Sequence, residues 1–246
     1  MLTAKPWKPW EALMLMSPVL LPYLITLVAQ PAGTPNTSSS EVPQLTSSYV
    51  ITDLILHLGY TALAIAILMR FHEIKLNDVI GHRNGRLSRI FPLSMASGVL
   101  FVVFVFMYFF WYDLVTNITS GSGPETQDVV IELKKATDQA DPLTLLILIA
   151  LPVIRAPIVE EFFFRGLLYP AIKATGHPKL ALITTALLFA VIHDNTRAFI
   201  PLVILSFLLT WQYERSGNLI SPILTHATFN LINSLLIVLV EFPPNA

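Results

Sequence analysis

The sequence has no cysteine and few charged residues. The missing cysteine excludes disulfide bridges, thiol nucleophiles and cysteine-bound zinc or iron–sulfur sites. Charged residues make up 13 % of the 246 residues, too few to cover a soluble globule of this length. The 15 basic residues are balanced by 16 acidic ones, so there is no basic excess for a polyphosphate, and we expect no nucleic-acid partner.

Hydrophobic residues are abundant instead, at 54 % of the chain with a mean hydropathy of +0.66. A helix needs about 20 apolar residues to cross the hydrocarbon core of a bilayer. The sequence therefore predicts an all-α protein, a polytopic membrane helical bundle of about seven transmembrane helices. The expected helices are Ala12–Ala29, Tyr49–Met69, Ile90–Tyr112, Leu143–Ala174, Leu180–His193, Ala198–Tyr213 and Leu219–Val240.

Three of these helices have special features. The first could also be read as a cleaved signal peptide, but its length and its Pro18 and Pro22 favour a membrane helix. The third is apolar on every face, so we expect it to contact lipid. The fourth is overlong and contains Pro152 and Pro157, each of which removes a backbone donor, so we expect a kink or a break.

Basic residues lie on one side of the predicted membrane. The segment from Arg70 to Arg89 holds five Lys and Arg residues, which places it in the cytoplasm under the positive-inside rule. Seven crossings from a cytoplasmic N-terminus then put ten basic residues inside and only Lys134, Lys135 and Arg197 outside. We expect an integral protein of the plasma (inner) membrane with an external C-terminus.

A few polar residues fall at membrane depth, where each charge costs about 2.5 to 3.5 kcal/mol on insertion scales. Glu161 and Arg165 are spaced i,i+4 with the acid first, which predicts an ion pair on one helix face. Glu160 points about 100° away and has no local partner. An unpaired carboxylate in this position suits a general base. The other polar residues at this depth are Arg155, His193, His226 and Asn230.

These residues are expected at one level of the bundle. If the fourth and fifth helices form an antiparallel hairpin that turns at Thr175–Pro178, Glu160 and His193 are equally far from the turn, at roughly 20 Å. His226 and Asn230 share a face of the last helix. Glu160, His193 and His226 could ligate zinc with an open position for water, or the same side chains could orient a water without metal. The spacing leaves both alternatives open.

Three short motifs, in a fixed order along the chain, resemble those of a known protein family. The chain has Glu160-Glu161-x-x-x-Arg165, then Phe189-x-x-x-His193, then His226-x-x-x-Asn230 on successive membrane helices. This resembles the CAAX-protease and bacteriocin-processing family of intramembrane proteases, related to the type II CAAX prenyl endopeptidase. The resemblance implies that Glu160 is the catalytic base, that His193 and His226 hold the water or a metal, and that Asn230 binds the oxyanion. Glu161, Arg165 and Phe189 would support them.

The resemblance also implies a function and a division of the chain. We expect an intramembrane endopeptidase in which residues 143–246 form a catalytic four-helix core, and residues 1–142 supply three further helices and an external loop in the same integral unit. Its substrates would be peptides or membrane proteins, with or without a lipid, and zinc is the candidate cofactor. The alternatives are a transporter or scaffold that uses the Glu and His cluster for proton relay or partner binding, and a catalytically inactive homologue.

Overall fold

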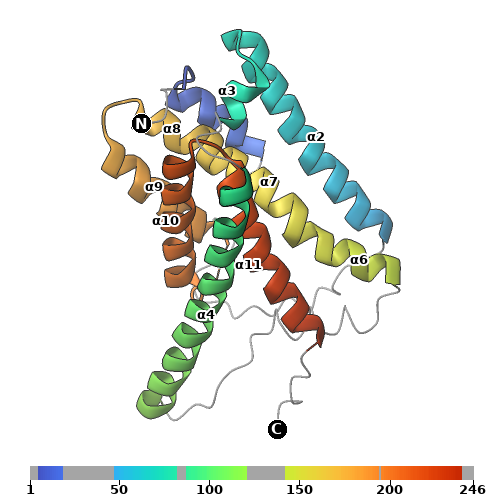
Figure 1. Ribbon diagram of the computed structural model, residues 1–246, viewed down its shortest axis with the longest axis vertical. Coiled ribbons are helices and arrows are strands. Elements are labelled where there is room, and N and C mark those ends of the chain that lie inside the picture. Colours follow the sequence, from blue (N-terminus) through green and yellow to red (C-terminus); the bar gives the residue numbers. More distant parts are fainter. Residues whose placement is uncertain (1–4, 19–46, 82–86, 121–141, 194, 240–246) are drawn as a thin grey trace, which may run out of the picture.

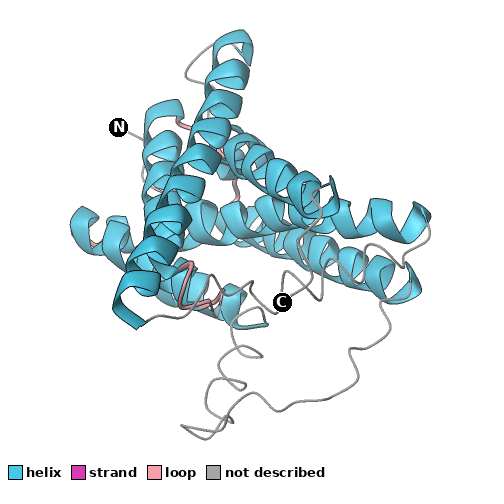
Figure 2. Cartoon of the chain, turned by 90° about the horizontal axis from the view of Figure 1, so that it is seen from below, coloured by secondary structure: helices cyan, strands magenta, loops and turns pink. Residues whose placement is uncertain are grey.

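The computed structural model describes residues 5–18, 47–81, 87–120, 142–193 and 195–239, and all regular secondary structure in this part of the chain is helical (Figures 1 and 2). Residues 9–18 form a first helix. The helices that follow are α2 Ser47–His72, α3 Leu76–Ile80, α4 Leu87–Ser120, α6 Pro142–Ala150, α7 Ala156–Glu161, α8 Tyr169–Lys173, α9 Pro178–Val191, α10 Phe199–Ser216 and α11 Ile220–Leu239.

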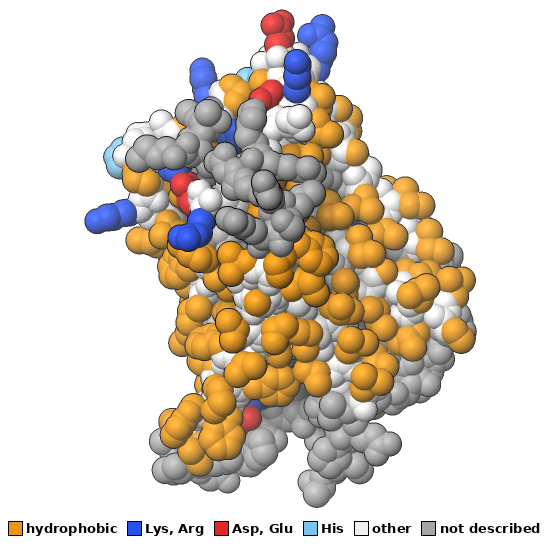
Figure 3. Space-filling view, in the orientation of Figure 1, with side chains coloured by type: hydrophobic (Ala, Val, Ile, Leu, Met, Phe, Trp, Pro, Cys, Tyr) orange, Lys and Arg blue, Asp and Glu red, His pale blue; other side chains and the backbone are white. Residues whose placement is uncertain are grey.

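Three helices are long and apolar enough to cross a membrane by length and composition, namely Leu54–His72, Ile90–Thr116 and Ile220–Leu239. Hydrophobic side chains cover most of the described surface in Figure 3, as expected for an integral membrane protein. Leu100, Phe106 and Trp111 of α4 are exposed, as predicted for a helix that contacts lipid.

The other expected spans are helical as well, but they do not meet the same criteria of length and hydropathy. The fourth carries five charged residues, α9 has only 14 residues, and α10 ends in polar residues. The predicted first span reaches Ala29, and its residues 19–29 lie outside the described residues. The count of seven therefore stays a prediction.

The fourth expected helix is continuous from Pro142 to Lys173, so the break considered above is absent. Its distortion takes the form of two π-helical stretches, η1 over Leu151–Arg155 and η2 over Phe162–Leu168. Pro152 lies inside η1, where a wider turn accommodates the proline ring and its missing N–H. The six-residue helix α7 between them carries Glu160 and Glu161.

The N-terminal segment is fastened to this distorted helix. The indole N–H of Trp7 donates to the carbonyl of Leu167 in η2 at 3.2 Å. The ammonium of Lys5 donates to the backbone carbonyl of Asp78 in α3. Burial lowers the pKa of Lys5 to about 8, and the negative charge of Asp78 opposes this shift. The segment thus joins α3 to η2.

Helices α4 and α11 are in close contact along small and hydroxylated residues. The hydroxyls of Ser94 and Ser221 lie 2.9 Å apart, and the hydroxyl of Thr225 donates to the carbonyl of Ser94 at 2.9 Å. A Cβ added to Gly98 would lie 2.8 Å from the carbonyl oxygen of Thr225 and 2.8 Å from the Cβ of Thr228. Glycine at this position allows the two backbones to approach.

Replacing Gly98 by Ala is therefore expected to destabilise the protein by about 1–3 kcal/mol, because the atoms in the way are backbone and Cβ atoms that cannot rotate aside. The matched control is Gly59→Ala in α2, where an added Cβ meets nothing within 4 Å. Thermal unfolding in detergent should show a lower midpoint for Gly98→Ala and an equal or higher midpoint for Gly59→Ala. Equal midpoints for the two variants would contradict the tight contact.

Candidate active site

A buried ion pair lies at the centre of the bundle. The guanidinium Nη1 of Arg165 donates to Oε1 of Glu161 at 3.0 Å, which is the i,i+4 pair that the spacing predicts, and both side chains have 0 % exposure. Arg165 also donates to Oγ and to the carbonyl of Ser206 in α10, at 2.7 and 3.1 Å. Its Nε lies 3.4 Å from the hydroxyl of Thr210. The guanidinium of Arg165, which lies in η2, thus has hydrogen-bond acceptors on both α7 and α10.

The Glu161 carboxylate that pairs with Arg165 also contacts His226 of α11. Nδ1 of His226 lies 3.0 Å from Oε1 of Glu161, and the His226 side chain is almost fully buried. An ionised carboxylate only accepts hydrogen bonds, so Nδ1 carries the hydrogen. This contact fixes the ring and leaves Nε2 directed toward Glu160.

Glu160 lies between the two histidines. Its Oε2 is 3.8 Å from Nε2 of His193 and 4.0 Å from Nε2 of His226. Oε2 is buried and, within the described residues, has no hydrogen-bond partner. Both separations are too long for a direct hydrogen bond. They are short enough for a water molecule to hydrogen-bond to Glu160 and to a histidine at the same time.

His193 is oriented from its other side by the backbone. Its Nδ1 donates to the carbonyl of Phe189 one turn earlier at 2.6 Å, which leaves Nε2 free to accept. The ring of Phe189 lies against His193 with centroids 4.7 Å apart, and the guanidinium carbon of Arg165 lies 4.8 Å from the same ring. Phe189 therefore separates the ion pair from His193 while contacting both.

Asn230 is positioned by the π-helical stretch η1. Its amide Nδ2 donates to the carbonyl of Pro152 at 2.7 Å. In the π register that carbonyl would accept from the residue five positions on, which is Pro157 and has no N–H. The asparagine supplies the missing donor and keeps a second N–H available. The carbonyl that the prolines leave without a backbone donor is thus the group through which Asn230 fastens α11 to η1.

A cavity of about 380 Å³ adjoins these residues. His193, Asn230 and Pro152 line one end of it, whereas Glu160 and His226 do not line it. The rest of its wall is mostly apolar and comes from α4, α10 and α11. Phe101, Val105 and Phe109 of α4, Pro201 and Leu202 of α10, and Phe229 and Ile237 of α11 supply most of that apolar wall.

The predicted zinc ligands do not form a metal-binding group at these distances. Two ligands of a tetrahedral zinc ion lie about 3.3 Å apart, so the histidine nitrogens are roughly half an ångström too far from Glu160. Within the part of the chain that the structure describes, no three His, Asp or Glu side chains are placed to hold a metal ion.

The structure brings together Glu160, His193 and His226, and Asn230 lines the same cavity as His193. Sequence reasoning missed Ser206 and Thr210, which bind Arg165. Their i,i+4 spacing within an apolar helix was an available signal, because hydroxyls on one face of a membrane helix often contact a polar partner. It also missed α4 as a wall of the cavity, for which the apolar sequence of that helix offers no signal.

Comparison with known proteins agrees with the motifs. Residues 142–232 match the family described as "Type II CAAX prenyl endopeptidase Rce1-like". The chain is also 31 % identical over 86 residues to the UPF0177 protein YxdF of Lactococcus lactis subsp. lactis (strain IL1403), which covers 35 % of this chain and 47 % of that protein. The chain thus spans about half the length of this curated relative. No solved structure matches significantly.

Proposed function

We propose, from the premise that residues 142–232 form an Rce1-like domain, that the chain is an intramembrane endopeptidase. The observation that carries the proposal is the unpaired Oε2 of Glu160 between the Nε2 atoms of His193 and His226. The match to an endopeptidase family favours hydrolysis over the transporter or scaffold hypothesis. The substrate is a peptide or a membrane protein.

The proposed reaction begins with a water held by Glu160 and His193. Glu160 takes one proton from this water, and the water oxygen attacks the carbonyl carbon of the scissile peptide bond. The carbonyl oxygen becomes an oxyanion, which Nε2 of a charged His226 and the second N–H of Asn230 stabilise. Glu160 then returns its proton to the leaving nitrogen, and the C–N bond breaks to give a carboxylic acid and an amine.

The ion pair has a supporting role in this scheme. Glu161 accepts a hydrogen bond from Nδ1 of His226 and so fixes the orientation of the ring. Arg165 forms the ion pair with Glu161, and both side chains are fully buried. Neither side chain needs to contact the substrate. Their contribution is to direct Nε2 of His226 into the reaction site.

Replacing His193 by Ala tests the proposal in cells and membranes. Substrates are first identified as peptides that accumulate uncut when the native chain is replaced by the variant, using mass spectrometry of peptide termini. We expect the cleavage rate of such a peptide in isolated membranes to fall about 100-fold or more, because the water loses one of its acceptors. His177→Ala, in the exposed turn before α9, is the control and should cleave normally. Normal cleavage by His193→Ala would contradict the assignment.

Metal removal gives an independent prediction. Because the histidine nitrogens are too far from Glu160 for a common tetrahedral ion, we expect the chelator 1,10-phenanthroline to leave the cleavage rate of purified protein unchanged. Metal analysis of the same sample is the second readout. Stoichiometric zinc, with loss of activity on chelation and recovery on zinc addition, would show instead that Glu160, His193 and His226 close around a metal.

A further inference from the structure

We infer that the active site is entered from the face of the membrane opposite the basic surface, and that the cavity beside His193 holds an uncharged, apolar peptide segment of the substrate. That the occupant is a segment of a peptide substrate rests on the proposed function. The direction of entry rests on the fold alone. On the positive-inside rule the basic surface is cytoplasmic, so the entrance faces outward.

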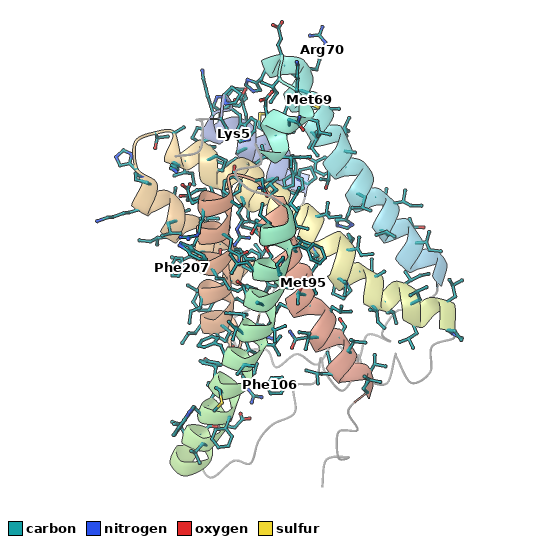
Figure 4. The ribbon with its side chains drawn as sticks, viewed as in Figure 1. Lys5, Met69, Arg70, Met95, Phe106 and Phe207 are labelled. Atoms are coloured by element: carbon teal, nitrogen blue, oxygen red, sulfur yellow. The ribbon has the colours of Figure 1, made fainter. Side chains whose placement is uncertain are left out.

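The basic residues of four separate segments meet at one end of the molecule. Lys5 contacts α3, Lys173 pairs with Glu214, and the N–H of Leu219 donates to the carbonyl of Ile80 at 2.8 Å, so these turns lie together. Lys and Arg side chains gather at this end in Figure 3, and Figure 4 labels Lys5 and Arg70 there. We call this end the basic end. Its described basic residues are Lys5, Lys8, Arg70, Lys75, Lys173, Lys179 and Arg215.

Between the basic end and the active site the bundle is tightly packed. Every residue of η2 is buried, from Phe162 to Leu168. On the facing helix α10, Leu209, Thr210, Gln212 and Tyr213 are buried too. Protein interiors of this kind have the density of organic crystals and leave no passage for a peptide. A substrate entering from the basic end would have to displace this layer.

The cavity extends in the opposite direction. On α11, His226 lies roughly 9 Å from the first residue of the helix, whereas cavity residues Phe229 and Ile237 lie roughly 14 and 26 Å from it. On α4 the cavity begins at Phe101, which lies between Met95 and Phe106, the two residues of this helix that Figure 4 labels. Beyond it, Arg197 pairs with Asp113 at the far end of α4.

The residues that line the cavity favour an occupant without charged side chains. Among the described residues the cavity lining contains no Asp, Glu, Lys or Arg, and most of these residues are apolar, so a charged side chain would be desolvated without a partner from them. The polar groups of the lining include Asn230 and, about one turn further along α11, Asn233 and Ser234. Amides in such a row can satisfy the backbone N–H and C=O groups of a peptide. A hydrocarbon chain would need none of them.

The missing cysteines permit a direct test of the direction of entry. Ser234→Cys in the cavity and Lys179→Cys at the basic end each introduce a single thiol into an otherwise cysteine-free chain. Right-side-out and inverted membrane vesicles are treated with a membrane-impermeant maleimide. We expect Ser234→Cys to react in right-side-out vesicles and Lys179→Cys in inverted ones. Reaction in detergent confirms that both thiols are reactive.

Two results would overturn the direction of entry. One is labelling of Ser234→Cys in inverted vesicles only. The other is labelling of this variant in detergent but in neither vesicle preparation, because the cavity would then be closed to water on both sides. Neither result depends on hydrolysis, so failure here is distinguishable from failure of the proposed function, which the His193→Ala comparison tests.

The nature of the occupant is tested by protection of the same thiol. A blocked peptide of Leu, Val and Phe residues should slow maleimide labelling of Ser234→Cys, and the same peptide with one Lys should need at least about tenfold higher concentration. Equal protection by both peptides would contradict an uncharged occupant. No protection by either peptide, with protection by a free fatty acid, would assign the cavity to lipid instead.

Discussion

Replacing Glu160 by Gln is expected to lower the cleavage rate by about 100- to 10,000-fold while leaving the folded protein intact. The amide has nearly the shape of the carboxylate but cannot accept the proton of the attacking water. Glu160 makes no ion pair with Arg or Lys among the described residues, and its Oε2 has no hydrogen-bond partner there, so the substitution removes chemistry rather than structure. Cleavage of an identified substrate by purified protein measures the effect.

The matched control for this variant is Glu11→Gln. Glu11 lies in the N-terminal helix and contacts His72 at 3.4 Å, well separated from the candidate site in the fold. This variant should cleave at the native rate. If Glu160→Gln kept native activity, Glu160 could not be the base, and the reaction would have to be assigned to another group. Thermal unfolding midpoints of both variants should match the native protein.

Replacing Arg165 by Met is expected to have the largest effect on stability, a loss of about 3–5 kcal/mol. The substitution leaves the carboxylate of Glu161 at zero exposure without its cation, and Oε2 of Glu161 already has no hydrogen-bond partner in the described structure. We expect little monodisperse protein in detergent and a strongly lowered unfolding midpoint. A native midpoint for Arg165→Met would contradict the role of the ion pair.

Two further variants separate charge burial from packing at this position. In Glu161→Leu with Arg165→Met, no charge remains buried, so much of the lost stability should return. Activity should stay low, because Nδ1 of His226 has then lost the carboxylate that orients it. Ser206→Ala removes one of the acceptors of Arg165 and should cost about 1 kcal/mol. A double variant as active as the native chain would show that the orientation of His226 does not depend on Glu161.

The helices and the local part of the site could be predicted from the sequence. Apolar runs predict membrane helices because their length matches the hydrocarbon thickness, and α2, α4 and α11 meet that criterion. The spacing of Glu161 and Arg165 predicts their pairing because residues four apart share a helix face. The hairpin register predicts that Glu160 and His193 lie at one level, and their side chains are 3.8 Å apart. The Rce1-like match supports the family resemblance read from the three motifs.

Contacts between helices could not be predicted in this way. The sequence predicts a distortion near Pro152 but not its π-helical form, nor that Asn230 would donate to the carbonyl left without a partner. The separations of Glu160 from the two histidines, 3.8 and 4.0 Å, depend on how three helices tilt against one another.

The sequence by itself determined that the chain is a membrane protein of helices, which residues are charged or polar at membrane depth, and which of them share a helix face. These properties follow from composition and from the period of a single helix. The tertiary structure alone decided that Ser206 and Thr210 bind Arg165, that α4 forms a wall of the cavity, and that the cavity extends away from the basic end. Such contacts depend on shape complementarity between distant segments, such as the close approach at Gly98, which no local pattern encodes.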